Sequence, residues 1–239
     1  MMKKRLLFVV VMLLACGSYA APAFADLALY DWAVNIDGVV SAFPSYAAQD
    51  PFLAEMDVVG FDAVTGLGTI RVTISAPGDH FVGLFVDHEI DQVVNTYYNE
   101  TGATVGTPAA GQTWEIDEPG WFNGDIYENL QLSDATGSSL DNGIGTSIHG
   151  ATTFPEDVSM AMGWRFSVAS GLPAIVEFSL SDVAPLGGFY LRQNDPDSDA
   201  SVYFSSTVVP LPGAVLLGAL GLGTAGSLVG RFQRRRTQK

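Results

Sequence analysis

The body of this chain has very little positive charge. Of its 11 Lys and Arg residues, only Arg71, Arg165 and Arg192 lie between Asp26 and Thr207, whereas all 26 acidic residues lie there. The body contains no lysine, and its formal charge is -23. A field of this sign repels phosphate groups. Nucleic acid is therefore excluded as a partner.

Cysteine is almost absent as well. The one cysteine, Cys16, lies near the N-terminus, so the body has neither a disulfide nor thiol chemistry. Residues 26–207 form a chain of roughly 180 residues, which is long enough for one domain that buries about 70% of its unfolded surface. A domain of this size needs no disulfide, so the lack of cysteine is compatible with export.

Residues 1–25 have the three parts of a secretory signal peptide. A basic triplet and an uncharged apolar run are followed by the small residues Ala23 and Ala25, and Asp26 comes next. This pattern predicts cleavage between Ala25 and Asp26. Two alternatives stay open: an uncleaved anchor helix and a lipoprotein with its lipid on Cys16.

Residues 208–239 read as a membrane anchor. Val208 to Gly230 is an uncharged run of 23 residues, and a membrane-spanning helix needs about 17–25. The run is followed by a cluster of arginines, Arg231, Arg234, Arg235 and Arg236. Positive charge stays on the cytoplasmic side of a membrane. We therefore expect a C-terminal transmembrane helix, with the acidic body outside the cytoplasm.

The C-terminal segment also resembles a known family of sorting tails. A short motif, Val209, Pro210, Leu211, Pro212 and Gly213, precedes the apolar run and the arginines. This three-part order resembles the PEP-CTERM tail, in a variant with leucine where glutamate is usual. The resemblance implies export, processing near the motif by an exosortase-like membrane protease, and a bacterium that makes exopolysaccharide.

The body has the pattern of an all-β fold. Apolar and polar residues alternate in short runs separated by Gly, Pro, Asp and Asn, which is typical of an antiparallel β-sandwich of the jelly-roll or immunoglobulin-like kind. The predicted strands are 56–61, 68–75, 81–86, 164–168, 175–180, 189–191 and 202–204. We expect a hairpin over 164–180 and long surface loops at 102–111 and 133–155. No internal window predicts a long helix.

Possible catalytic and metal-binding groups are few. Ser147 and His149 lie in a near match to a G-x-S-x-G motif, but the surrounding pattern does not predict the strand, turn and helix that this motif requires. His80 and His88 lie near acidic residues and are either metal ligands or solvated strand ends, and we prefer the second interpretation. No catalytic residue is predicted.

Two further groups of residues leave alternatives open. Carboxylates at 115–118 lie near Trp114 and Tyr127 in the sequence, a composition that suits either a sugar-binding face or an ordinary core and its rim. Asp195, Asp197 and Asp199 alternate in a turn, as calcium ligands do. Ala200 interrupts the EF-hand pattern, so a solvated acidic turn is the preferred interpretation. Apart from calcium, no cofactor is expected.

These patterns predict a cell-surface or extracellular-matrix protein. Its role would be structural or adhesive, without enzymatic activity, and the C-terminal tail would anchor it until processing. Its expected partners are the membrane, the sorting protease and exopolysaccharide. The alternative is a secreted carbohydrate-binding module or carbohydrate-active enzyme.

Overall fold

The computed structural model describes residues 26–91, 100–119, 124–145 and 157–210. Within these residues the chain forms eleven strands and one short helix, α2 (Ile126–Leu132). The strands are β1 (Leu27–Ile36), β2 (Val39–Ala42), β3 (Met56–Asp62), β4 (Leu67–Ile74), β5 (Gly78–Ile90), β6 (Thr101–Val105), β7 (Gln112–Asp117), β8 (Ser159–Val168), β9 (Ala174–Ser181), β10 (Tyr190–Asn194) and β11 (Ser201–Pro210).

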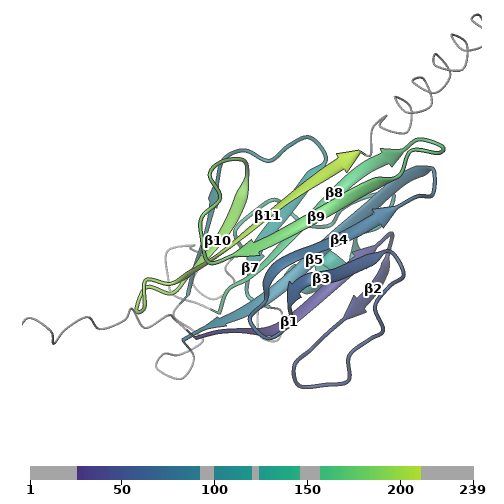
Figure 1. Ribbon diagram of the computed structural model, residues 1–239. Helices are drawn as coiled ribbons and strands as arrows, with labels where there is room; N and C mark the ends of the chain where they lie inside the picture. The colour runs from purple at the N-terminus through teal and green to yellow at the C-terminus, as the bar shows by residue number, and fades with distance from the viewer. Residues whose placement is uncertain (1–25, 92–99, 120–123, 146–156, 211–239) are drawn as a thin grey trace, which may run out of the picture.

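The strands form two antiparallel sheets that pack face to face (Figure 1). The first sheet has the order β2-β1-β5-β8-β7, and the second has the order β3-β4-β9-β11-β10-β6. Val34 and Leu84 of the first sheet share one apolar core with Val176 and Phe204 of the second. The prediction of an all-β fold with a sandwich-like core is confirmed.

Strand β9 shows why the alternating pattern predicts these strands. Ala174, Val176, Phe178 and Leu180 are buried, while the residues between them are partly exposed. Successive side chains of a strand point to opposite faces. One face of β9 therefore packs against the core, and the other meets solvent.

The first sheet is covered on both faces. Its outer face carries a second apolar cluster, in which Phe81 and Phe85 pack against Ile126 and Leu130 of α2. Asn35 holds the end of the helix, because its Nδ2 donates to the carbonyl oxygens of Leu130 at 2.6 Å and Ser133 at 2.7 Å. These bonds satisfy backbone acceptors that a helix end leaves without partners.

Two facing glycines allow this second layer to lie close to the sheet. Gly83 on β5 is opposite Gly163 on β8. A Cβ atom at Gly83 would lie 2.7 Å from Leu130, and one at Gly163 would lie 2.7 Å from the Phe81 ring. The Phe81 ring therefore occupies space that a side chain at either position would need.

The predicted hairpin over 164–180 is wrong. Strand β8 belongs to the first sheet, where it pairs with β5 and β7. Strand β9 belongs to the second, where it pairs with β4 and β11. The short connection crosses between the sheets, so β8 and β9 follow each other in sequence but do not pair. By contrast, the predicted strands at 56–61 and 68–75 are confirmed, and they pair as the β3–β4 hairpin.

Two predicted loops contain regular or buried structure. Strand β6 lies inside the predicted loop 102–111 and pairs with β10. The loop 133–155 begins with the buried Ser133 and includes the buried Leu140. Strands β1, β2 and β7 and helix α2 were not predicted.

Most of the two predicted terminal segments lies outside the described residues. This holds for Ala23, Ala25, the Leu211–Pro212–Gly213 part of the motif and the arginine cluster. Strand β11 continues to Pro210, so the first three residues of the predicted tail pair with β9. In the part of the chain that the structure describes, no helix is long and apolar enough to span a membrane.

Candidate functional site

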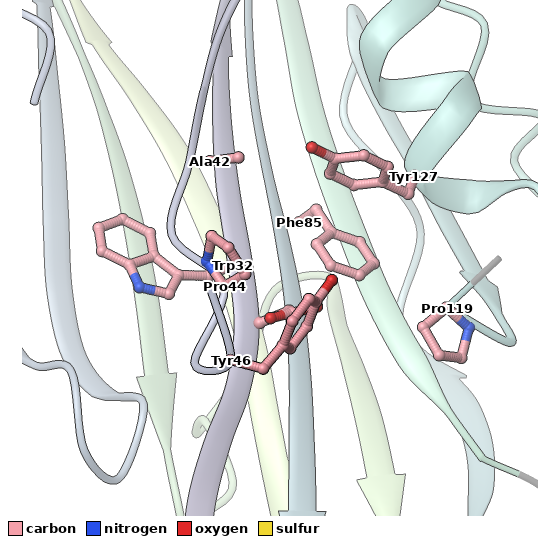
Figure 2. Close-up of a pocket in the computed structure, with 8 residues that line it drawn as sticks. Trp32, Ala42, Pro44, Tyr46, Phe85, Pro119 and Tyr127 are labelled. Carbon is pink, nitrogen blue, oxygen red and sulfur yellow. The ribbon is translucent and has the colours of Figure 1, made fainter. Parts of the chain in front are cut away.

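A small pocket lies on the outer side of the first sheet, between β1, β5 and α2 (Figure 2). In Figure 2 the rings of Tyr46, Phe85 and Tyr127 gather around it, whereas the Trp32 ring points to the other side of β1. The lining residues are Asp31, Trp32, Ala42, Pro44, Tyr46, Phe85, Pro119 and Tyr127. Its volume is about 70 Å³, well below the roughly 300–1,000 Å³ of most small-molecule sites. The pocket therefore admits only part of a ligand.

An irregularity in β1 brings an acid to this pocket. The β1–β5 register shifts between Leu29 and Asp31, so that Asp31 lies opposite Asp87 of β5. The Asp31 side chain is buried, and its Oδ1 accepts a hydrogen bond of 3.2 Å from the Ser45 backbone nitrogen. The Tyr46 hydroxyl also donates to this carboxylate. Asp31 and Tyr46 thus form one polar unit at the rim of the pocket.

Burial shifts the ionisation of both groups. Desolvation raises the pKa of Asp31 to about 6, although the hydrogen bonds from Ser45 and Tyr46 oppose the shift. Desolvation, with the nearby Asp31 charge as a second cause, raises the pKa of Tyr46 to about 12. Asp31 therefore changes charge near pH 6, while Tyr46 stays a hydrogen-bond donor at neutral pH.

Exposed aromatic rings extend this site across the surface. The rings of Tyr30 and Tyr46 lie 5.6 Å apart and are tilted by 32°. Tyr46 is 53% exposed. On the other side of β1 the buried Trp32 stacks on Phe43 with ring centroids 4.0 Å apart, and Phe52 packs against these two rings. The exposed rings of the site are therefore those of Tyr30 and Tyr46.

This arrangement can bind a molecule that has both apolar faces and hydroxyl groups. Aromatic side chains offer an apolar ring, and tyrosine adds a polar tip. Asp31 accepts hydrogen bonds when it is ionised, and Tyr46 and Tyr127 carry hydroxyl groups beside it. We refer to Tyr30, Asp31, Tyr46 and Tyr127 as the tyrosine–aspartate site.

A second cluster lies near the start of α2. Glu115, Asp117 and Asp125 bring one carboxylate oxygen each within 4.8 Å of one another, and among the described residues no other three acidic, His or Cys side chains come so close. Desolvation raises the pKa of Glu115 to about 8. Asn129 donates to both oxygens of Glu115, at 3.1 and 3.2 Å. The Asp117 carboxylate accepts from the backbone nitrogens of Glu118 and Asp125. Hydrogen bonds within the protein therefore already occupy the carboxylates of Glu115 and Asp117.

The histidines are not solvated strand ends, so the preferred interpretation of them is wrong. His80 is buried, and its ring nitrogens contact Asp37 at 2.7 Å and the Ala76 carbonyl at 2.8 Å. His88 is fully buried, and its Nε2 lies 3.3 Å from the Gly66 carbonyl oxygen. Desolvation lowers the pKa of His88 to about 4. They lie near opposite ends of β5 and do not share a site.

The Asp195 loop is a turn between β10 and β11. Asp195 is buried, its Oδ1 accepts from the Asp197 backbone nitrogen at 2.9 Å, and its Oδ2 accepts from the Ser198 hydroxyl at 2.6 Å. Asp199 has a positive φ of 57°. Asp195 thus shapes the turn through its own carboxylate, and calcium binding by this loop stays a prediction.

Only part of the predicted sugar-binding face lies at the pocket. Trp114 packs against the core with its ring 5.7 Å from that of Phe189, so it is not an exposed stacking platform. Tyr127 lines the pocket. Ser147 and His149 lie outside the described residues. The sequence did not predict Tyr30, Asp31 or Tyr46 as site residues. The apolar spacing of Trp32, Val34 and Ile36 was the available signal for β1, the strand that contains Tyr30 and Asp31.

Comparison with protein-family models, with curated proteins and with solved structures finds no match to this chain.

Proposed function

We propose that this protein is an exported surface adhesin whose body binds polysaccharide through the tyrosine–aspartate site. The observation that carries the proposal is the exposed pair Tyr30 and Tyr46 beside Asp31 and the small pocket. Stacked rings suit the apolar faces of sugar units, and the carboxylate and hydroxyl groups suit their hydroxyl groups. The jelly-roll or immunoglobulin-like type of the sandwich is part of the same proposal.

The small volume of the pocket favours a long ligand over a small one. A pocket of about 70 Å³ holds one group of a sugar unit, while the exposed rings of Tyr30 and Tyr46 provide contact area outside it. A polymer that lies across the surface can use both. Exopolysaccharide is therefore the ligand class that we propose.

Binding is a better account of this site than hydrolysis. Glycosidases generally place two carboxyl groups on either side of the bond they cleave. Among the described residues, the pocket presents only the carboxylate of Asp31. The other carboxylates with raised pKa values that we discuss do not line it. We therefore propose an adhesive role rather than a carbohydrate-active enzyme.

The proposed location rests on the two ends of the sequence. The signal-like segment 1–25 and the PEP-CTERM-like tail 208–239 support export, C-terminal anchoring and processing by an exosortase-like protease. The arginine cluster after the apolar run supports a position of the body outside the cytoplasm, because positive charge stays on the cytoplasmic side. A reporter that is active only outside the cytoplasm should work after Thr207 and fail after Lys239, and the opposite result would reverse this topology.

Affinity electrophoresis of the full-length protein through gels that contain exopolysaccharide from its own cells tests the adhesive function. We expect polysaccharide to retard the wild-type protein and Tyr46→Ala to weaken binding. An aromatic contact is worth about 0.5–1.5 kcal/mol, which corresponds to roughly two- to tenfold in affinity. Tyr190→Ala removes a ring from the Tyr190–Tyr203 pair on the second sheet and should bind as the wild type does. Equal binding by Tyr46→Ala, Tyr127→Ala and the wild type would refute the proposal.

A further inference from the structure

A group of buried acids lies where β5 ends and β8 begins. Asp87 of β5 is opposite Ser159 of β8. Asp157 lies two residues before Ser159, and desolvation, followed by the nearby Glu89 charge, raises the pKa of Asp157. Side chains two residues apart on a strand share a face, so Asp87 and Glu89 lie together on the outer face of the first sheet.

Hydrogen bonds bring two more residues to this group. Glu100 Oε2 accepts from the Val158 backbone nitrogen at 3.2 Å, which places Glu100 beside Asp157. Gln193 Nε2 donates to Glu100 Oε2 at 2.5 Å and to the His88 carbonyl oxygen at 2.6 Å. Both atoms that contact this position are hydrogen-bond acceptors, so it must be the amide nitrogen of Gln193 and not the amide oxygen. Gln193 therefore links Glu100 to the backbone between Asp87 and Glu89.

Several oxygen atoms of this group are buried and have no partner. Asp87 and Glu100 are each 1% exposed, and Gln193 is 0% exposed. Asp87 Oδ1, Glu100 Oε1, Asp157 Oδ1 and Gln193 Oε1 find no hydrogen-bond partner among the described residues. Each buried acceptor without a partner costs about 1–3 kcal/mol, and a charged one costs more. Such a set is unfavourable unless something binds to it.

No basic side chain compensates these acids in the described part of the chain. The two ion pairs found there, Arg71–Glu177 and His80–Asp37, lie elsewhere. Desolvation, followed by the nearby Asp157 and Glu89 charges, raises the pKa of Asp87 well above its usual value. Desolvation also raises the pKa of Asp157 to about 7. The acids thus repel one another and lack a counter-charge.

We propose that Asp87, Glu89, Glu100 and Asp157, together with the side-chain oxygen of Gln193, bind one calcium ion. We refer to these five residues as the β5–β8 acid site. All five offer oxygen atoms, and calcium takes 6–8 oxygen ligands at about 2.3–2.6 Å in flexible geometry. The His88 ring contacts the Gly66 carbonyl on the other face of the sheet, so no nitrogen ligand from the described residues competes for a softer metal.

The ion would draw these groups together. No three carboxylates of the site have oxygens within 4.8 Å of one another, since only the cluster at Glu115 meets that limit among the described residues. Opposite ligands of a calcium ion lie about 5 Å apart. Binding would therefore require the side chains to rotate toward the ion, with water as a further ligand. The bound ion would join the ends of β5, β8 and β10.

The site differs from the other acidic groups in its unpartnered oxygens. At the Glu115 cluster and in the Asp195 turn, hydrogen bonds within the protein already engage the carboxylates. In the β5–β8 acid site, by contrast, three of the four carboxylates and one amide oxygen each have an unpartnered atom. A cation bound at the β5–β8 acid site would therefore interact with oxygen atoms that have no hydrogen-bond partner.

Calcium titration of the full-length protein in detergent, followed by calorimetry, tests the proposal. We expect one saturable site with a Kd at or below about 10⁻³ M, the upper range of extracellular calcium modules. Asp87→Asn and Glu100→Gln should each weaken it about tenfold or more. The exposed carboxylate variant Asp57→Asn is the matched control and should bind as the wild type does.

Folding of the variants is checked by thermal unfolding in EDTA. Asp87→Asn removes a buried acid, so the variant should melt no lower than the wild type without calcium and should gain much less stability than the wild type when calcium is added. If Asp87→Asn does not fold, Glu100→Gln carries the test. The proposal fails if the wild type does not saturate, if magnesium or sodium chloride gives the same effect, or if Glu115→Gln removes binding while Asp87→Asn does not.

Discussion

Asp31 occupies its position because β1 is irregular. The shift in the β1–β5 register between Leu29 and Asp31 lets Tyr30 reach the surface while Asp31 enters the pocket. A regular strand would not place two neighbouring residues beside the same site, because successive side chains alternate. The tyrosine–aspartate site thus depends on this local departure from strand geometry.

The raised pKa of Asp31 predicts pH-dependent binding. Its pKa is about 6, so the side chain is a negatively charged acceptor above this pH and a neutral acid below it. If Asp31 accepts hydroxyl groups of the polysaccharide, affinity should rise between pH 5 and pH 7. Affinity electrophoresis across this range measures the change. Asp31→Asn removes the charge and should flatten the profile, so an unchanged profile in this variant would contradict the assignment.

Gly163 is a second residue whose role can be tested. A Cβ atom there would lie 2.7 Å from the Phe81 ring, and such overpacking typically costs about 1–3 kcal/mol. Gly163→Ala should therefore lower the melting temperature by several degrees, at about 2–4 °C per kcal/mol for a domain of this size. Gly187→Ala is the control, since nothing lies within 4 Å of a Cβ atom at that position. Equal melting of the two variants would show that the Phe81 layer adapts.

At the scale of elements, alternation of apolar and polar residues made β9 predictable, whereas β1 lacks this pattern. Strand β9 alternates and was predicted, whereas β1 is buried from Trp32 to Ile36 without interruption. The cover on the outer face comes from α2, which has only seven residues and too short a pattern to stand out.

Strand pairing and the candidate site were harder to predict than strand existence. The apolar pattern of β8 and β9 fits the inner face of either sheet, so it does not decide whether the two strands pair. Tyr46 and Tyr127 come from distant parts of the sequence, and only the fold brings them together. Local patterns contain no information of this kind.

The length of β11 refines the predicted processing site. Val208, Val209 and Pro210 pair with Val176, Ile175 and Ala174 of β9. A protease needs an extended, accessible chain, and residues held in a sheet are protected until the strand separates. We therefore expect cleavage after Pro210, within Leu211–Gly213. Mass spectrometry of the mature protein from its own cells should find a C-terminus at or beyond Pro210. A C-terminus at Thr207 or earlier would mean that β11 opens before cleavage.

At the scale of the whole molecule, the two ends of the sandwich have different character. One end contains Pro210, which pairs with Ala174 at the start of β9. The short connection from β8 to β9 also lies at this end, where Val168 of β8 is opposite Gly78 of β5. The β5–β8 acid site lies at the other end of β5, where Ile90 is opposite Leu27. Under the proposed anchoring, the end of the sandwich that contains Pro210 would face the membrane and the acid site would lie at the far end, away from anionic headgroups.

The buried acids together predict how stability depends on pH. Their folded pKa values exceed their unfolded ones, with Asp157 at about 7 and Glu115 at about 8. The stability that such groups contribute is present below the unfolded pKa and is lost as pH rises through the folded value. His88 has the opposite sign, because its folded pKa is about 4. It favours folding as pH rises, but only up to its unfolded value near 6.5.

Between pH 6.5 and pH 8.5 the acids therefore decide the trend. In EDTA the melting temperature of the full-length protein should fall over this range, since Asp157 and Glu115 must ionise while they remain buried. Calcium at the β5–β8 acid site favours the ionised form of Asp157, so calcium should reduce the fall in the wild type. In Asp87→Asn, calcium should change it much less. Differential scanning calorimetry with and without calcium measures both slopes. A melting temperature that rises with pH in EDTA over this range would show that these acids are not held in the environment described here.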